Sequence, residues 1–317
     1  MELITHNRSS SLSDCNSSYS NCSKDLDHFD PFYYNHPLGK AVDWLIIGVG
    51  LPAIGLAGYA LFRLDRADYV APVFVINLLI SDLLQIAITA VFIASRYFDA
   101  EMAALRTARA VSRVIVHLGL AASLAFMLCI SLERYLLVAH AVWHRSHRSV
   151  RLSVSLSLAV WAAALVYVVL EYMLSPDGAH SQVVFSVTSL LPAPFLVFSC
   201  VGTWRALRRS LSLQRGERRR VVGALALVVG IYAVLFLPFS LRNLCYALRG
   251  DSAPDQASIL SSVATSCLLY LSPLADPFLY IFMRRDVRHA LDSLCCRAGR
   301  RGRDHQLPTM SDTVTSV

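Results

Sequence analysis

Charged residues are scarce in this chain, and lysine is almost absent. Only 16% of the 317 residues are Asp, Glu, Lys or Arg, whereas 55% are hydrophobic and the mean hydropathy is +0.50. This composition is too apolar for an ordinary soluble domain of this length. The first residues also lack the basic stretch followed by an apolar run that marks a cleavable signal peptide. The sequence therefore predicts a polytopic membrane protein whose first apolar segment acts as its own signal.

Apolar windows long enough to cross a bilayer occur seven times. A span needs about 20 mostly apolar residues. The windows are residues 42–62, 70–94, 108–138, 152–174, 183–205, 219–247 and 257–283. We expect an all-α bundle of seven transmembrane helices. The expected divisions are an extracellular segment (1–40), the bundle (41–283), an amphipathic membrane-surface helix (284–296) and a disordered cytoplasmic tail (297–317).

Basic residues set the expected orientation. Of the 29 Lys and Arg residues, 19 fall on one side of the predicted membrane, 7 on the other and 3 within spans. By the positive-inside rule, the N-terminus lies outside. Three N-glycosylation sequons in the predicted outer segment agree with this orientation: Asn7, Asn16 and Asn21. The net charge of +7 is then a cytoplasmic feature that contacts lipid headgroups, and no nucleic-acid partner is expected.

Several charged residues lie inside the predicted spans. Asp82 follows Asn77 by five residues in the second span, Glu133 and Arg134 close the third, and Asp276 precedes a proline in the seventh. Charges at membrane depth cost about 3 kcal/mol each on insertion scales, so they tend to be paired and functional. These residues are the first candidates for a functional site.

Together with other landmarks, these residues resemble a known family. The order and spacing of Asn77 to Asp82, Glu133-Arg134-Tyr135, Trp161, Pro194 (or Pro192), Phe236 to Phe239 and Asp276 to Tyr280 resemble the rhodopsin-like (class A) G-protein-coupled receptors, over about residues 40–296. The run Phe236-Leu237-Pro238-Phe239 resembles the purinergic and lipid-receptor branch. The resemblance implies a plasma-membrane receptor and no enzymatic activity. Its implied partners are an extracellular small ligand and a heterotrimeric G protein, with arrestins and receptor kinases.

The resemblance also assigns roles to single residues. Arg134 pairs with Glu133 in the inactive state and is released toward the G protein when the sixth span moves. The expected switch residues are Glu133, Arg134, Tyr135, Phe236, Pro238, Asp276, Pro277 and Tyr280, with Phe236 and Pro238 as the toggle and the hinge of the sixth span. Asp82, Ser123 and Asp276 are expected to line an internal sodium site, which suits a hard cation that prefers oxygen ligands. No other cofactor is expected.

Some positions depart from the family pattern. Ile54 replaces an asparagine of the first span, Phe236 a tryptophan, and Gly202 (or Cys200) a tyrosine of the fifth span. Arg218 stands where many relatives have an acid that locks the switch arginine, so we expect a weak cytoplasmic lock. Arg109 replaces the usual cysteine of the outer third span, and residues 175–182 contain no cysteine partner. These departures keep open the alternative of a non-signalling scaffold or decoy receptor.

The outer halves of the spans indicate the ligand class. Val116 stands where amine receptors have an aspartate, and no lysine lies in a span to form a Schiff base with retinal. Arginine is suited to bidentate capture of carboxylate or phosphate. We expect an anionic lipid or nucleotide-like ligand with Arg113 and Arg242 as anchors. The full set of expected ligand residues is Arg109, Arg113, His117, Glu171, Arg242, Asn243 and Tyr246.

Two alternatives compete with this ligand hypothesis. The arginines can instead pair with Glu171, Glu101 or lipid headgroups and bind no ligand. A proton-sensing receptor of the same fold is the other alternative, because histidines titrate in the relevant pH range. Outer or near-outer histidines are His6, His28, His36, His117 and His180.

The ends of the chain carry candidate modification and docking sites. Cys295 and Cys296 follow the predicted surface helix and are candidates for palmitoylation. The last residues, Thr315-Ser316-Val317, fit a peptide that docks its carboxylate into a PDZ domain. The outer cysteines Cys15 and Cys22 can close a loop, with Cys245 as a competing partner, and the sequence leaves this connectivity open.

Overall fold

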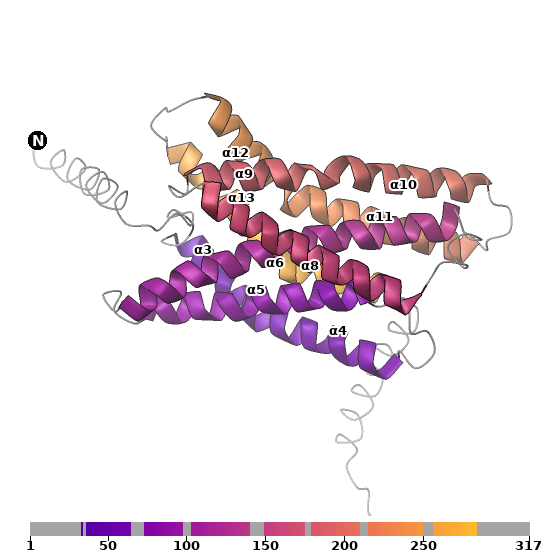
Figure 1. Ribbon diagram of the computed structural model, residues 1–317, viewed down its shortest axis with the longest axis horizontal. Helices are drawn as coiled ribbons and strands as arrows, with labels where there is room; N and C mark the ends of the chain where they lie inside the picture. The colour runs from indigo at the N-terminus through magenta and orange to yellow at the C-terminus, as the bar shows by residue number, and fades with distance from the viewer. Residues whose placement is uncertain are drawn as a thin grey trace, which may run out of the picture.

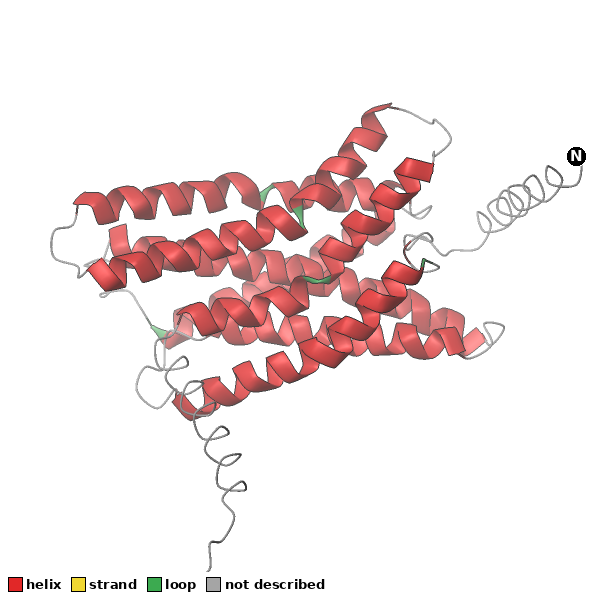
Figure 2. Cartoon of the chain, turned by 180° about the vertical axis from the view of Figure 1, so that it is seen from behind, coloured by secondary structure: helices red, strands yellow, loops and turns green. Residues whose placement is uncertain are grey.

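The computed structural model describes residue 33 and residues 36–64, 73–97, 103–139, 149–174, 179–209, 215–249 and 256–283, almost all of them in helices (Figures 1 and 2). Seven helical segments are long and apolar enough to cross a membrane, which confirms the predicted seven-helix bundle. The end of the bundle predicted to face outside is called the outer end below. The predictions on the termini lie outside the described residues; they concern Asn7, Asn16, Asn21, Cys15, Cys22, residues 284–296 with Cys295 and Cys296, and residues 297–317.

The seven candidate spans are built from twelve helical elements. The first four spans contain α3 (Pro37–Leu45), η1 (Ile46–Gly50), α4 (Leu51–Leu64), α5 (Val73–Tyr97), α6 (Ala103–Ala139) and α8 (Val150–Leu174). The last three contain α9 (Ala179–Leu190), α10 (Pro192–Arg209), α11 (Arg215–Leu235), α12 (Leu237–Arg249), α13 (Gln256–Tyr270) and α14 (Ser272–Met283). The last three spans are thus each divided into two helices.

The divisions coincide with prolines. The helix breaks at Leu191 before Pro192, at Phe236 before Pro238, and at Leu271 before Pro273. Proline has no N–H to donate to the carbonyl four residues earlier, and its ring crowds that carbonyl, so the helix kinks. The sixth span breaks at the expected hinge near Pro238, whereas the seventh breaks before Pro273 and α14 continues through Pro277, the proline beside Asp276.

The first span changes its helical winding midway. Ile46–Gly50 forms a π-helical segment between α3 and α4. Pro52, which cannot donate a backbone hydrogen bond, follows at the start of α4. The segment ends at Gly50, where a Cβ atom would come within 2.9 Å of Ile86 and 3.1 Å of Leu274. The missing side chain lets the first span approach the second and seventh closely.

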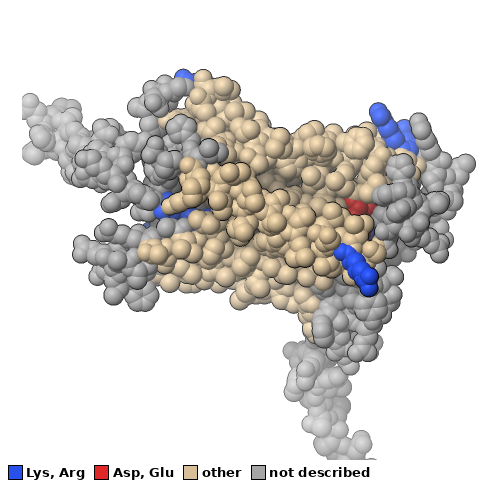
Figure 3. Space-filling model, viewed as in Figure 1, with Lys and Arg blue, Asp and Glu red and all other residues tan. Residues whose placement is uncertain are grey.

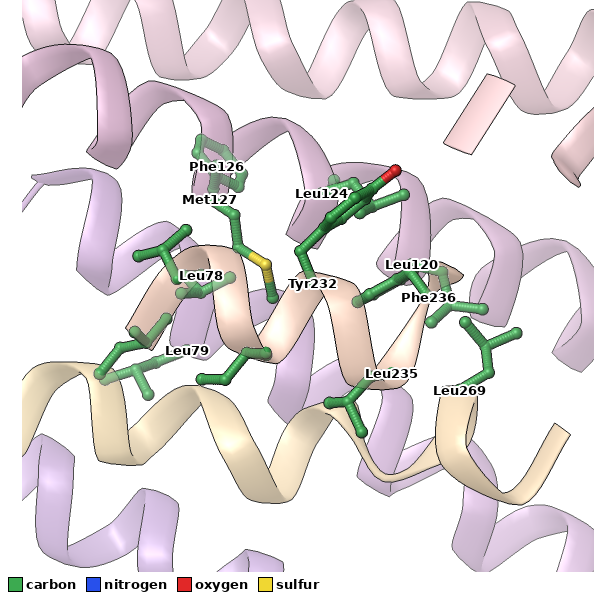
Figure 4. Close-up of a cluster of buried hydrophobic side chains, with 14 of the residues drawn as sticks. Leu78, Leu79, Leu120, Leu124, Phe126, Met127, Tyr232, Leu235, Phe236 and Leu269 are labelled. Atoms are coloured by element: carbon green, nitrogen blue, oxygen red, sulfur yellow. The ribbon is translucent and has the colours of Figure 1, made fainter. Parts of the chain in front are cut away.

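Helix α6 forms the centre of the bundle. Within its span, Val111–Ala139, 56% of the most apolar window is buried, against 17% for the fourth span, Val150–Met173. It packs against α5, α8, α10 and α11. Its Phe126 and Met127 are fully buried in one core cluster with Phe236 (Figure 4). Because α6 is the most buried span, the functional site has to be sought around it. The visible charged side chains lie at the two ends of the molecule, and the belt between them is uncharged (Figure 3).

Candidate functional site

Two aspartates and a serine meet in the middle of the bundle. Asp82 comes from α5, Ser123 from α6 and Asp276 from α14, and each is at most 1% exposed. The Ser123 hydroxyl donates to Oδ2 of Asp276 at 3.0 Å, and the Asp82 carboxyl group is near enough to that of Asp276 for the two to interact electrostatically. As carboxylates, both oxygens of Asp82 and Oδ1 of Asp276 lack a hydrogen-bond donor among the described residues. The structure brings the three expected sodium-site residues together.

This cluster needs a positive partner. Two carboxylates buried side by side repel each other, and each also loses its hydration. A shared proton or a bound cation relieves both penalties. The buried carboxylate and hydroxyl oxygens are the ligand type that a hard cation prefers, so the residues fit sodium. The described residues contain no group of three His, Cys, Asp or Glu side chains suited to a transition metal.

A second polar link joins the second, third and fourth spans. Trp161 of α8 donates from Nε1 to Oδ1 of Asn77 on α5 at 2.9 Å, and Asn77 donates to the carbonyl oxygen of Val73 at 2.8 Å. The Trp161 ring also meets the Phe126 ring edge-on, with 5.8 Å between their centroids. Two of the family landmarks, Asn77 and Trp161, are therefore direct partners, and they fix the second span against the fourth.

The expected switch lies at the inner end of α6. Glu133, Arg134 and Tyr135 are half-buried there. The Tyr135 ring packs edge-on against Phe198 of α10, with 5.3 Å between centroids. A Cβ atom on Gly202 of α10 would lie 2.5 Å from the Tyr135 ring. Gly202, one of the two positions at which the resemblance places a tyrosine, thus makes room for the aromatic ring of the third span.

This contact gives a first test by mutation. Replacing Gly202 with alanine is expected to lower the thermal unfolding midpoint, because overpacking a fitted site costs about 1–3 kcal/mol. Gly223→Ala is the matched control, since a Cβ at Gly223 meets nothing within 4 Å. Adding Tyr135→Ala to Gly202→Ala should recover part of the loss, as a double-mutant cycle of the purified protein would measure. Equal midpoints for the two glycine variants would contradict the contact.

An acid and a histidine pair at the outer half of the bundle. Nδ1 of His117 on α6 lies 2.9 Å from Oε1 of Glu171 on α8. Glu171 is 3% exposed, whereas a quarter of the His117 side chain reaches the surface. The structure thus places Glu171, proposed by one alternative as the partner of an arginine, in direct contact with the histidine.

A row of aromatic rings connects this pair to the sixth span. The His117 ring lies 5.6 Å from Phe185 of α9, and Phe185 lies 6.1 Å from Phe239 of α12. Arg113 stands one helical turn outward from His117, and Arg242 one turn outward from Phe239. Both arginines are half-buried. The row of rings therefore links α6, α9 and α12, and an arginine lies one turn farther out at each end of the row.

The remaining expected site residues differ in placement. Arg242 donates through Nη2 to Asn243, whose own side-chain amide donates to the Ser186 hydroxyl at 3.2 Å. Tyr246 is 46% exposed and points away from the core. The side chains of Arg109 and Arg218 at the ends of the bundle and of Tyr280 on α14 lie outside the described residues, although their backbones are helical.

Comparison with known proteins agrees with these landmarks. A family model described as the seven-transmembrane receptors of the rhodopsin family matches residues 56–280. The chain belongs to the rhodopsin family of seven-transmembrane receptors. It is accordingly a multi-pass membrane receptor, and not an enzyme.

Individual relatives of the receptor are distant. The human uracil nucleotide/cysteinyl leukotriene receptor is 27% identical over 210 residues, which are 57% of this chain and 56% of that receptor. Bovine G-protein coupled receptor 68 is 24% identical over 310 residues, covering 88% of this chain and 84% of the relative. Human proteinase-activated receptor 2 is 24% identical over 297 residues, covering 84% and 74%. Membership of this family implies a G protein and an extracellular ligand.

The receptor also holds a polar network that sequence reasoning missed. Ser189 of α9 and Ser240 of α12 lie 2.6 Å apart, and the Tyr232 hydroxyl of α11 donates to the Ser189 carbonyl oxygen at 2.8 Å. The Tyr232 ring stacks near Phe236, the predicted toggle, with 6.1 Å between centroids (Figure 4). The prolines near these residues were the sequence signal that could have revealed the network. A broken helix leaves a carbonyl oxygen that can accept a hydrogen bond from a side chain. The network fastens the fifth span to the sixth at the predicted hinge.

Proposed function

We propose that the receptor binds a small anionic ligand, a lipid acid or a nucleotide-like molecule, at its outer end and activates a heterotrimeric G protein at its inner end. The supporting observation is the row of His117, Phe185 and Phe239, which links α6, α9 and α12 and is flanked by half-buried Arg113 and Arg242. Apolar walls with a few polar anchors are the usual make-up of a small-ligand site.

The chemistry of the anchors supports an anion. Guanidinium groups bind carboxylate and phosphate in a bidentate way, and a half-buried site strengthens such hydrogen bonds. The name of one relative combines uracil nucleotides with cysteinyl leukotrienes, and both kinds of molecule carry acidic groups. Since that receptor is only 27% identical, its ligands serve as a guide to screening.

The test is a dose–response series in cells. Pools of anionic lipids and of nucleotides are applied to the wild type, Arg113→Ala and Arg242→Ala at equal surface expression. Loss of one charged hydrogen bond costs about 1.5–3 kcal/mol, so agonist potency should fall roughly 10- to 100-fold in each variant. Arg249→Ala is the control, because this exposed arginine lies farther out on α12. An unchanged potency in both anchor variants would exclude the anchor role.

Proton sensing is a second candidate, and the contact between His117 and Glu171 favours it. A histidine gains a proton as the pH falls through its range, and that charge strengthens its bond to a carboxylate. The pair joins α6 to α8 at 2.9 Å, so its strength affects how these spans are held. A pH ramp from 8 to 6 without added ligand separates the candidates: a response lost in His117→Phe supports proton sensing, and a flat trace excludes it.

The orientation of the receptor and its accessory sites complete the proposed function. The receptor's N-terminus faces outside with glycans on Asn7, Asn16 and Asn21, and the basic inner loops face the G protein and lipid headgroups. A sodium ion occupies the site of Asp82, Ser123 and Asp276. The accessory proposals are palmitoylation of Cys295 and Cys296, PDZ docking of Thr315, Ser316 and Val317, and regulation by arrestins and receptor kinases.

A further inference from the structure

Tyr33 is buried although it precedes the first span. Its side chain is only 3% exposed, and its hydroxyl donates to Oδ1 of Asp43 at 2.8 Å. Asp43 lies within α3 and is itself 5% exposed. The Tyr33 ring lies 4.7 Å from the ring of Tyr270 on α13, tilted by 49°. A residue of the N-terminal segment thus contacts both the first span and the seventh.

Residues of α3 and α13 enclose the Tyr33 side chain and together form what is called the socket. Val263 and Cys267 of α13 are buried in one small cluster with Tyr33, and Val42 of α3 packs against it. A Cβ atom on Gly39 would overlap the carbonyl oxygen of Tyr33. Only a glycine at this position lets the Tyr33 backbone lie so close to α3. Val42 and Val263 supply apolar contacts, and Asp43 supplies the acceptor for the hydroxyl.

This chemistry selects a phenol. Burial raises the pKa of the Tyr33 hydroxyl well above its usual range, and the nearby Asp43 carboxylate raises the pKa further. The hydroxyl therefore keeps its proton at neutral pH and donates it to Asp43. A hydrogen bond from a hydroxyl to a carboxylate is about twice as strong as a neutral one. A phenyl ring would fill the same space but leave that bond unmade.

We propose that the socket between α3 and α13 is a binding site for a phenolic ring, and that Tyr33 is its built-in ligand. Tyr33 stands four residues before Pro37, the first residue of α3, so the short tether gives a high effective concentration at the socket. The bound ring ties the first span to the outer half of the seventh, whose continuation, α14, carries Asp276. An external phenol enters only when Tyr33 is absent or displaced.

The experiment uses the purified full-length receptor and measures its thermal unfolding midpoint with 4-methylphenol or with toluene, which lacks the hydroxyl. Tyr33→Ala should lower the midpoint by several degrees, and 4-methylphenol should restore most of that loss, whereas toluene should restore much less. The wild type, whose socket is filled, should not respond to 4-methylphenol. Gly39→Ala should also destabilise the receptor, because it displaces Tyr33 without altering the phenol.

Two controls make the outcome decisive. Tyr172→Ala removes a 58% exposed phenol from α8 and should neither shift the midpoint nor create a response to 4-methylphenol. Alkylation of Cys267 by N-ethylmaleimide, followed by peptide mass spectrometry, should speed up in Tyr33→Ala and slow again with 4-methylphenol. Equal responses to 4-methylphenol in the wild type and Tyr33→Ala, or none in either, would overturn the proposal. Neither readout needs a G protein or an agonist, so failure here is distinct from failure of the proposed function.

Discussion

Replacing Arg134 with alanine is expected to reduce G-protein activation to background while the receptor still reaches the cell surface. Arg134 is half-buried at the inner end of α6, the central helix of the bundle, beside Glu133 and one residue before the ring that packs on Gly202. The family resemblance predicts that this arginine is the switch. Alanine keeps the helix but removes the guanidinium group, so folding should survive and the contact with the G protein should not.

The measurement compares nucleotide exchange in cells that express wild type, Arg134→Ala or Arg151→Ala. Arg151 is an exposed arginine at the inner end of α8 and serves as the control for losing one cytoplasmic charge. The screen includes anionic lipids, nucleotides and the pH ramp. Signalling that survives in Arg134→Ala would exclude the switch role. A wild type that is silent under every condition, although present at the surface, would favour a scaffold or decoy receptor instead.

Removing one of the two facing carboxylates should abolish any stabilisation by sodium. In the wild type, sodium should raise the thermal unfolding midpoint relative to choline, because it supplies the positive partner that Asp82 and Asp276 lack among the described residues. A ligand at 100 times its Kd stabilises the folded state by about 2.7 kcal/mol. Asp82→Asn should be insensitive to sodium and at least as stable as wild type in choline, because the repulsion is gone.

Two further variants sharpen this result. Ser123→Ala removes the hydroxyl that donates to Asp276 at 3.0 Å and should weaken the sodium effect without abolishing it. Asp43→Asn changes a buried carboxylate with a different partner, Tyr33, and should keep the full sodium effect. A wild-type midpoint that is the same in sodium, potassium and choline would show that the two acids share a proton rather than hold an ion.

Local features of the sequence predicted much of this fold. Hydropathy windows locate seven spans because a helix in lipid has to satisfy its own backbone hydrogen bonds and to face the lipid with apolar side chains. Prolines account for the breaks in the last three spans because the missing N–H is a property of the residue itself. The meeting of Asp82, Ser123 and Asp276 followed from the family landmarks. The spans and the helix breaks needed no knowledge of contacts between distant residues, whereas the meeting of the three polar residues is such a contact and came from the family resemblance alone.

Other features depend on partners far apart in the sequence. The predicted first span begins at residue 42, whereas α3 begins at Pro37. Lys40 makes the stretch before residue 42 look polar, and the sequence does not show the hydrogen bond from Tyr33 that satisfies the buried Asp43 carboxylate. Gln85 and Gly119 are a similar case, because a Cβ at Gly119 would lie 2.8 Å from the Gln85 side chain, and only the fold shows why glycine stands there.

The π-helical segment Ile46–Gly50 also bears on how the first span tolerates insertion and deletion. A π turn holds one more residue than an α turn, so this segment can lose one residue by becoming α-helical while the side chains on either side keep their orientation. Asp43 would then stay beside Tyr33, and Pro52 and the inner half of the span would keep their places. A one-residue deletion should therefore be tolerated in this stretch, whereas the same deletion within α4 would turn the side chains before it by about 100° relative to those after it.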